Sequence, residues 1–356
     1  MYTEIHKSKM RRAATKFCGK LTSKRRIILG VGIIGIGKKL ADNIVMNEEI
    51  CELMDTSNEW IIERTGITER RIATTQKSLD LAVDATKEAL EGIDYDSIDL
   101  VIVATCTPDM LVPSMGSLVK MELGLKNAIV FDLNSACSGF VFTLWTAESL
   151  MNASQEKMGR KINRALVIGS ERITRIADWT DRGSCILFGD GAGTVLLERR
   201  EGQTGIITTF LKNYDDVNQA LWCGLDYEPN PFSKEEISPP RTLQMKGTQV
   251  FKFAVTAVNE VMEEVLKCAD MDASEVDFYV PHQANMRIIK SAAARFKQPL
   301  EKFQISINQT GNVSAASIPM ALYDAMQEGK VKSGDTIMFV GFGGGLSAGA
   351  SLVKLW

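Results

Sequence analysis

Histidine is almost absent from this sequence: among 356 residues there are only two, His6 and His282. Because His6 lies in a basic leader, any catalytic histidine in the folded part of the chain must be His282. Long apolar runs are absent as well, since no stretch approaches the roughly 18 residues that a membrane-spanning helix requires. The net charge of −3 gives no general electrostatic reason to bind nucleic acid. We therefore expect a protein that neither crosses a membrane nor binds nucleic acid.

A framework of paired cysteines is also missing. The chain has seven cysteines, an odd number, and none of them has the Cys-x-x-Cys spacing that is typical of zinc sites. Disulfides and a metal site are therefore not expected. A reducing, cytoplasmic location fits this cysteine usage best.

The first 28 residues differ in charge from the rest. They contain nine Lys or Arg and one acidic residue, Glu4, which leaves a net charge of −11 for the remainder. A basic leader with Ser and Thr is typical of a transit peptide, but a solvated tail or an over-extended start explains the same composition. We expect residues 1–27 to form a disordered basic extension, and the fold is argued without them.

From residue 28 onward the sequence alternates between predicted strands and helices. Continuous apolar runs such as LVIVA indicate strands that are buried on both faces. Strands are predicted at residues 97–107, 128–133, 164–171, 193–198 and 276–282. Helices are predicted at residues 78–93, 138–153, 251–269, 286–296 and 321–329. This alternation is typical of right-handed βαβ units around a covered sheet.

A weak internal repeat is visible. IDLVIV at residue 98 resembles VDFYVP at 276, and FGDGAGTVLL at 188 resembles FGGGLSAGASLV at 342. Because the pairs occur in the same order, they indicate two similar α/β halves, residues 28–200 and 201–356. Within the second half, residues 221–247 contain six prolines and glycines, which predict a loop over the surface.

Cys137 lies where a predicted strand meets a predicted helix, in the small-residue stretch SACSG (135–139). A turn this sharp resembles the nucleophile elbow of hydrolases. A thiol at a helix N-terminus is stabilised as thiolate by the helix dipole, so a lowered pKa is expected. The alternative is a buried free cysteine that only packs, and this stretch alone does not decide between the two.

Two further polar residues lie at similar junctions. His282 follows a predicted buried strand, at the end where ligands gather in open α/β sheets. Asn312, in INQTGNVSAAS, lies in the second half's counterpart of the Cys137 turn. The two turns are expected to face each other with His282 between them, although a lone histidine or asparagine is more often structural.

Glycine is concentrated in GFGGGLSAGAS (341–351). The stretch lacks the Lys-Ser/Thr pair of a phosphate-binding loop. It predicts either a backbone oxyanion hole, because glycine lets the chain approach a ligand closely, or a plain hairpin between two strands.

These motifs together resemble β-ketoacyl-acyl-carrier-protein synthase III, a condensing enzyme of the thiolase superfamily. The resemblance runs from about residue 28 to 356, and the basic leader is the clear departure from it. The matching stretches are DTSNEWIIERTGITERRIA (55–73), ACSGF (136–140), DRGSCILFGDGAG (181–193), MKGTQVFKFAV (245–255), PHQANMRII (281–289), GNVSAASIP (311–319) and GFGGGLSAG (341–349).

The resemblance implies a thiolase-like α/β fold, in which two similar βαβαβαββ halves pack as a five-layer αβαβα sandwich. It also implies a catalytic triad of Cys137, His282 and Asn312. Cys137 would take the acyl group from a short acyl-CoA such as acetyl-CoA, in a ping-pong scheme. His282 and Asn312 would hydrogen-bond to the enolate that forms when malonyl-acyl carrier protein loses carbon dioxide. The N–H groups of Cys137 and Gly344 would form the oxyanion hole.

The implied product is 3-ketoacyl-acyl carrier protein, which initiates type II fatty acid biosynthesis. No cofactor is implied, because coenzyme A enters as part of the substrate. The residues implied to bind coenzyme A are Trp60, Arg64, Arg182, Gly247, Phe251 and Asn285. Those implied to dock the acidic carrier protein are Lys252, Arg287 and Arg295.

The acyl pocket implied by the resemblance has Phe188 and Phe342 as walls. Val112 takes the place of a gatekeeper that reaches the pocket from the other subunit of a homodimer. Because Val112 is smaller than the Phe found there in some relatives, a longer or branched primer is expected to enter.

Other protein classes share some of these features. A papain-like protease also uses Cys, His and Asn in that order, but the buried parallel strands do not fit that class. Hydroxymethylglutaryl-CoA synthases and thiolases are closer, yet HQAN and GNVSAAS favour synthase III. A specialised-metabolism paralogue with a different acyl donor stays open. An inactive subunit of a condensing complex is disfavoured, because such a subunit usually lacks the cysteine.

Overall fold

The computed structural model describes residues 29–157, 159–224, 232 and 241–356. The predicted basic extension at residues 1–27 and much of the predicted loop at 221–247 lie outside the described residues. Within the described part of the chain, no helix has the length and apolar character needed to cross a membrane.

The first sheet has five strands, in the order β1-β7-β6-β4-β5. They are β1 (Leu29–Leu40), β4 (Leu100–Ala104), β5 (Ile129–Leu133), β6 (Arg164–Arg172) and β7 (Asp190–Glu201). Strand β4 runs parallel to β5 and β6, whereas β7 runs antiparallel to β6 and β1. Every residue of β4 is buried, which confirms the prediction from its uninterrupted apolar run.

The second sheet repeats this topology, in the order β11-β12-β13-β8. Its strands are β8 (Ile206–Asn213), β11 (Phe278–Pro281), β12 (Thr336–Gly343) and β13 (Ser347–Lys354). The first strand of each half pairs with the last one, β1 with β7 and β8 with β13. Where the first sheet has β5, the second has only a parallel bridge between Tyr279 and Phe303. The weak sequence echo therefore reflects a structural repeat.

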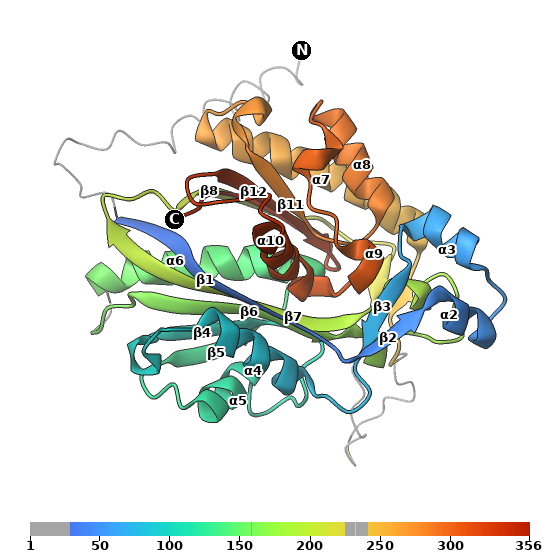
Figure 1. Ribbon diagram of the computed structural model, residues 1–356, viewed down its shortest axis with the longest axis horizontal. Helices are drawn as coiled ribbons and strands as arrows, with labels where there is room; N and C mark the ends of the chain where they lie inside the picture. The colour runs from blue at the N-terminus through green and yellow to red at the C-terminus, as the bar shows by residue number, and fades with distance from the viewer. Residues whose placement is uncertain (1–28, 158, 225–231, 233–240) are drawn as a thin grey trace.

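Helices cover both sheets and fill the space between them (Figure 1). The central layer consists of α6 (Gly139–Lys157) and α10 (Ser317–Gln327). The outer layer on the first sheet consists of α4 (Ser78–Ala89) and α5 (Met115–Leu123), and that on the second of α7 (Gly247–Ala269) and α8 (Met286–Arg295). This arrangement confirms the expected five-layer αβαβα fold.

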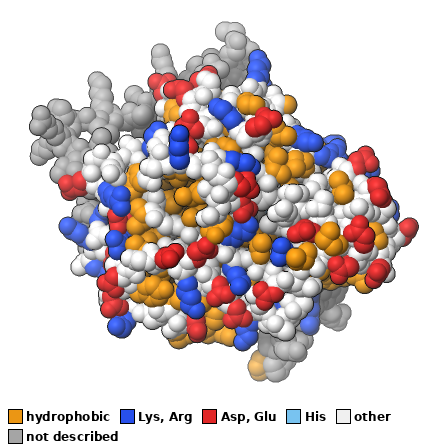
Figure 2. Space-filling view, in the orientation of Figure 1, with side chains coloured by type: hydrophobic (Ala, Val, Ile, Leu, Met, Phe, Trp, Pro, Cys, Tyr) orange, Lys and Arg blue, Asp and Glu red, His pale blue; other side chains and the backbone are white. Residues whose placement is uncertain are grey.

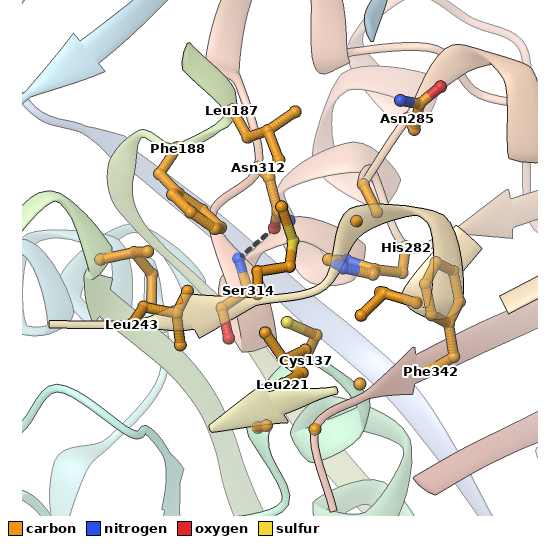
Figure 3. Close-up of a pocket in the computed structure, with 18 of the residues that line it drawn as sticks. Cys137, Leu187, Phe188, Leu221, Leu243, His282, Asn285, Asn312, Ser314 and Phe342 are labelled. Atoms are coloured by element: carbon orange, nitrogen blue, oxygen red, sulfur yellow. Dashed lines mark hydrogen bonds between the residues drawn. The ribbon is translucent and has the colours of Figure 1, made fainter. Parts of the chain in front are cut away.

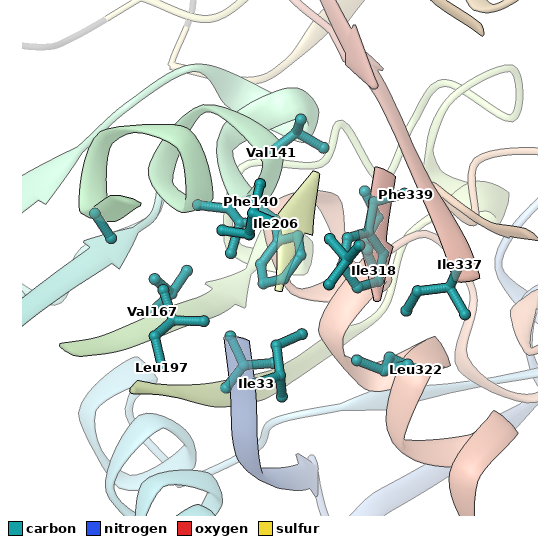
Figure 4. Close-up of a cluster of buried hydrophobic side chains, with 14 of the residues drawn as sticks. Ile33, Phe140, Val141, Val167, Leu197, Ile206, Ile318, Leu322, Ile337 and Phe339 are labelled. Atoms are coloured by element: carbon teal, nitrogen blue, oxygen red, sulfur yellow. The ribbon is translucent and has the colours of Figure 1, made fainter. Parts of the chain in front are cut away.

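The main core lies in the central layer (Figure 4). Phe140 of α6 meets Phe339 of β12 edge to face, with ring centroids 5.4 Å apart. Ile318 of α10 and Val167 of β6 belong to the same buried cluster. Because one core joins α6, α10 and both sheets, it fixes the relative position of the two turns at which these helices begin.

Helices α7 and α10 begin at Gly247 and Ser317, four residues earlier than predicted in each case. Glycine at the start of α7 and Pro319 in the first turn of α10 obscured these boundaries. Proline is tolerated in a first turn because the N–H group that it lacks has no partner there.

The prediction of a surface loop at residues 221–247 is wrong at both ends of the segment. Strands β9 (Leu221–Trp222) and β10 (Gln244–Met245) pair antiparallel, and Leu221 and Leu243 line the central cavity. Apolar side chains at the base of the insert are partly buried there, which its proline and glycine content did not indicate.

The remaining elements form a small cap beside the first sheet. It consists of β2 (Asn43–Met46), α2 (Asn47–Leu53), α3 (Asn58–Thr65) and β3 (Glu69–Ile72), and α9 (Ile307–Thr310) contacts it from the second half. The buried Arg70 of β3 fixes the cap by donating to Oδ1 of Asn47 at 2.7 Å and to the carbonyl of Ile186 at 3.0 Å. On the face shown in Figure 2, acidic and basic side chains are interspersed.

Candidate active site

Cys137 occupies a strained turn at the carboxyl end of β5. The turn is a short 3-10 helix, Ala136–Ser138, which leads directly into α6 at Gly139. Ala136 has a φ of 44°, a left-handed conformation that non-glycine residues seldom adopt. The side chain of Asn134 stabilises it by accepting the Ala136 N–H at 3.1 Å. The prediction of a cysteine at the start of a helix is confirmed.

A matching turn precedes α10 in the second half. Ser314 has a φ of 47° and starts the 3-10 helix Ser314–Ala316. Oδ1 of Asn312 accepts the Ser314 N–H at 2.9 Å (Figure 3). Asn312 thus repeats the role of Asn134, and the position equivalent to Cys137 is held by Ala315.

The two turns are packed against each other. A Cβ placed on Gly139, the first residue of α6, would lie 3.2 Å from Cβ of Ala315. Because Oδ1 of Asn312 is held by Ser314, the amide is oriented with its Nδ2 group as the donor left for a ligand. Asn312 itself is held by Leu187, whose carbonyl accepts its N–H at 2.7 Å.

His282 follows β11 and is almost fully buried, with 2% of its surface exposed. Its Nδ1 lies 2.5 Å from Oγ of Ser317, and its ring meets Phe342 edge to face at 5.2 Å. Oγ of Ser317 also accepts the N–H of Gln283 at 3.4 Å. We assign the Ser317 proton to the bond with Nδ1, which makes Nε2 of His282 the protonated, donating nitrogen.

Burial lowers the pKa of His282 to about 3. The imidazole is therefore neutral at physiological pH. A neutral ring with a proton on Nε2 is a hydrogen-bond donor to a ligand, and it does not carry a positive charge that could hold a thiolate.

The pKa of Cys137 contradicts the expectation from the sequence. Burial raises the pKa of this thiol to about 11, the hydroxyl of Ser314 lowers the pKa in part, and the carboxyl of Glu171 raises it further. The expected lowering by the helix N-terminus is thus outweighed by loss of hydration, because a thiolate is poorly stabilised away from water. At neutral pH the thiol of Cys137 is protonated.

These residues meet in one cavity of about 960 Å³. Figure 3 shows Cys137, His282 and Asn312 grouped around one end of it, with Asn285 farther away. Phe188 and Phe342, the predicted walls of the acyl pocket, line the cavity. Other predicted residues along its lining are Trp60, Arg64, Gly247, Phe251, Asn285, Arg287 and Gly344.

The glycine-rich turn lies directly against Cys137. A Cβ placed on Gly343, the last residue of β12, would be only 2.6 Å from the backbone N of Cys137. At Gly344, the predicted partner in the oxyanion hole, the nearest side-chain atom to such a Cβ would be Cβ of Ala136 at 3.6 Å. Close approach of backbone is thus the physical reason for glycine at 343.

Aromatic and cationic side chains gather at the mouth of the cavity. The guanidinium carbons of Arg182 and Arg64 lie 5.1 Å and 5.5 Å from the ring centroid of Trp60. Nη1 of Arg182 donates to the carbonyl of Asp55 at 2.7 Å. Asn285 caps α8 and donates to the carbonyl of Arg64 at 2.9 Å, so the structure brings these predicted coenzyme A contacts together.

Lys252, Arg287 and Arg295, the residues predicted to dock the carrier protein, differ in their position relative to the cavity mouth. The guanidinium of Arg287 lies 5.0 Å from the ring centroid of Phe251 and borders the cavity. Lys252 borders a separate hollow of about 260 Å³. Nη2 of Arg295 lies 2.6 Å from Oε1 of Glu263, which offsets its charge. Only Arg287 is therefore placed at the mouth itself.

Val112 lies outside the cavity of its own chain and is 80% exposed. Leu111 and Met110 beside it are 72% and 45% exposed. Val112 belongs to the same half of the chain as β5, the strand at the edge of the first sheet. A gatekeeping role for Val112 therefore requires a second copy of the chain.

Sequence reasoning missed three polar residues of the site. Ser317 fixes the ring of His282, Ser314 lines the same cavity as Cys137, and Glu171 is fully buried at the end of β6. A signal for Glu171 was present, because this acidic residue ends the predicted strand RALVIGSE (164–171). The strand is parallel to β4 and β5, so its end lies at the same edge of the sheet as the turn that holds Cys137. The two serines lie in the matched stretch GNVSAASIP but were not singled out.

Comparison with known proteins identifies the family. The family model described as 3-Oxoacyl-[acyl-carrier-protein (ACP)] synthase III matches residues 131–214, and its C-terminal counterpart matches residues 266–355. The β-ketoacyl-[acyl-carrier-protein] synthase III of Clostridium beijerinckii is 43% identical over 326 residues, 91% of this chain and 99% of that protein.

Solved structures agree with this result. The crystal structure of 3-oxoacyl-[acyl-carrier-protein] synthase III from Aquifex aeolicus VF5 matches with a TM-score of 0.83 and 40% identity, over 91% of this chain and all of that one. The priming β-ketosynthase of the R1128 polyketide biosynthetic pathway matches with a TM-score of 0.83 and 32% identity, over 95% and 99% of the two chains. The chain belongs to the β-ketoacyl-[acyl-carrier-protein] synthase III family.

Proposed function

We propose that the protein condenses a short acyl-CoA with malonyl-acyl carrier protein, with release of coenzyme A and carbon dioxide. The product is 3-ketoacyl-acyl carrier protein, and the reaction initiates type II fatty acid biosynthesis. The observation that carries this proposal is the convergence of Cys137, His282 and Asn312 at one end of a single cavity. A nucleophile and two neutral donors there match the two halves of such a reaction.

In the first half-reaction, the sulfur of Cys137 attacks the carbonyl carbon of the acyl-CoA thioester. The carbonyl oxygen becomes negative and is stabilised by the N–H groups of Cys137 and Gly344. Coenzyme A leaves as a thiol that carries the proton given up by Cys137, and the acyl group stays on Cys137 as a thioester. Trp60, Arg64 and Arg182 are positioned to hold the nucleotide end at the mouth.

In the second half-reaction, malonyl-acyl carrier protein loses carbon dioxide and becomes an enolate. Nε2–H of His282 and Nδ2–H of Asn312 donate to the enolate oxygen, which needs donors rather than a base. The nucleophilic carbon then attacks the acyl-Cys137 thioester, and the thiolate of Cys137 is released. The scheme needs no cofactor other than the coenzyme A that arrives with the substrate.

The partners are proposed from surface features. Arg287 at the mouth offers a positive charge to an acidic carrier protein. The exposed apolar residues at positions 110–112 and the edge strand β5 favour a homodimer, because such surfaces are rarely left in water. Six free cysteines among the described residues favour a reducing compartment such as the cytoplasm.

Replacement of His282 or Asn312 with Ala is expected to separate the half-reactions. Each variant should slow decarboxylation of malonyl-acyl carrier protein by about 10²- to 10³-fold, the usual cost of one oxyanion donor. Acylation of Cys137 should change far less, because neither side chain is assigned to it. Carbon dioxide release and acyl-adduct formation are measured separately; equal losses in both would contradict the assignment.

The size of the side chain at position 112 is expected to set which acyl-CoA primer the protein uses. Because Val112 is small, isobutyryl-CoA should be used at a rate within about tenfold of that of acetyl-CoA, whereas Val112→Phe should reduce its use by about 10- to 200-fold. Turnover of both primers is compared in each variant, with Leu111→Phe as the matched control at the neighbouring exposed position. A strong acetyl preference of the native protein would count against this role.

A specialised-metabolism paralogue is the second candidate. The observation in its favour is the 32% identity to a priming β-ketosynthase of a polyketide pathway. The two candidates differ in the acyl donor, so a panel of acyl-CoAs and acyl carrier proteins tested as donors separates them.

A further inference from the structure

Serine hydroxyls join the two backbone turns that meet at Cys137. Ser138, which follows Cys137, and Ser347, the first residue of β13, are both fully buried. Their Oγ atoms lie 2.8 Å apart, although the two residues are separated by 209 positions in the chain. The proposed mechanism uses neither hydroxyl.

Each of these serines is also bound to its own turn. Oγ of Ser138 lies 2.8 Å from the carbonyl oxygen of Ser135 and 3.0 Å from Oγ of Ser135, so these two residues bracket Cys137. Oγ of Ser347 donates to the carbonyl of Gly344 at 3.1 Å. Ser135, Ser138 and Ser347, which we call the serine chain, therefore connect one turn to the other.

The three hydroxyls have three protons to share among these contacts. We assign the protons so that Ser135 donates to Ser138 and Ser138 donates to Ser347. Ser347 then donates to the carbonyl of Gly344, which can only accept. The carbonyl of Ser135 keeps the backbone N–H of Ser138 as its partner, at 3.2 Å. In this direction every proton is used, and the serine chain ends on an acceptor.

The turn at Gly344 needs an anchor of this kind. Gly344 lies between Gly343 and Gly345, and glycine loses more conformational freedom on folding than any other residue. A backbone N–H is effective against a developing charge when it is held in place before the reaction. Ser347 holds the carbonyl of Gly344 and so fixes the peptide that follows it. The preceding peptide is confined by the close approach of Gly343 to Cys137.

We propose that Ser138 and Ser347 are positioning residues for the oxyanion hole. Their shared hydrogen bond holds the N–H groups of Cys137 and Gly344 at the separation that lets both donate to one oxygen atom. That atom is the carbonyl oxygen of the thioester, which becomes negative when the sulfur of Cys137 attacks. The two serines act through the backbone of the turns that they join. This inference rests on the proposed function and deepens it.

The test measures single-turnover acylation of the full-length protein over a range of acetyl-CoA concentrations. Ser138→Ala and Ser347→Ala should each lower the maximal rate by about 10- to 100-fold, because a displacement of about 1 Å can cost about 10²-fold. The acetyl-CoA concentration that gives half of the maximal rate should stay near the native value, since the proposed nucleotide contacts lie at the mouth of the cavity. Joint replacement should cost little more than the larger single loss, because both changes break the same hydrogen bond.

Carbon dioxide release from malonyl-acyl carrier protein separates a positioning role from general support of the fold. Its proposed donors, His282 and Asn312, are held by Ser317 and Ser314, which lie outside the serine chain. Release should therefore stay near the native rate in both single variants. A merely structural role would lower acylation and release together.

Ser351→Ala is the matched control. Ser351 is a fully buried serine of the same strand, β13, and its Oγ lies 2.9 Å from Oγ1 of Thr209. Its loss should leave acylation at the native rate, even where the thermal midpoint falls. Native acylation by Ser138→Ala and Ser347→Ala, equal losses of acylation and carbon dioxide release, or losses that multiply in the double variant would overturn the positioning role alone. A native protein that no acyl-CoA acylates would overturn both this role and the proposed function.

Discussion

A protein that carries Cys137→Ala takes up no acyl group from acyl-CoA and condenses its substrates at least about 10⁴-fold more slowly than the native protein. The reason is that the acyl-enzyme cannot form without the sulfur, and Ala315, at the equivalent position of the second half, offers no replacement. Intact mass measured after exposure to acyl-CoA reports the adduct, and carrier-protein assays report the condensation.

The same variant should still release carbon dioxide from malonyl-acyl carrier protein, because Nε2 of His282 and Nδ2 of Asn312 are unchanged. Cys268→Ala is the control: this exposed thiol near the end of α7 should be dispensable for adduct formation. An adduct that persists in Cys137→Ala, for example on Cys223 in the lining of the same cavity, would contradict the assignment of the nucleophile.

Gly343→Ala is expected to damage both stability and activity. Its new methyl carbon would lie 2.6 Å from the backbone N of Cys137 and 3.0 Å from Cβ of Cys137. Either the glycine-rich turn or the Cys137 turn therefore has to move. Overpacking of this kind costs about 1–3 kcal/mol of unfolding free energy. A displacement of about 1 Å at the nucleophile can cost about 10²-fold in rate. Denaturant titration and single-turnover acylation measure the two effects.

Gly159→Ala provides the comparison for this substitution. Gly159 is exposed, and no atom lies within 4 Å of the position that its Cβ would take. This variant should fold and react like the native protein. Native-like acylation by Gly343→Ala would show that the glycine turn is not packed against Cys137 as the structure has it.

Much of the fold could be predicted from the sequence because its signals are local. The run LVIVA gave β4, and the small residues around Cys137 gave the turn before α6. Asn312 was found in the same way, because its turn repeats the pattern strand, small residues, helix. The same order of strand, small-residue turn and helix occurs twice, and this repetition was enough to indicate two similar halves.

Other features depend on contacts between distant segments and were beyond a reading of the sequence. The raised pKa of Cys137 follows from burial by both halves, which outweighs a local helix dipole. Ser317 reaches His282 across 35 positions, and Glu171 reaches Cys106 across 65 positions. The residue pattern within a single helix or strand does not indicate which distant side chains it will contact.

The most direct test of the central claim is to weigh the intact protein after incubation with acetyl-, isobutyryl- and longer acyl-CoAs and to map the site of any adduct. We expect a gain of one acyl group on Cys137, which disappears when malonyl-acyl carrier protein is added. Absence of an adduct from every acyl-CoA, with the protein shown to be folded, would contradict it.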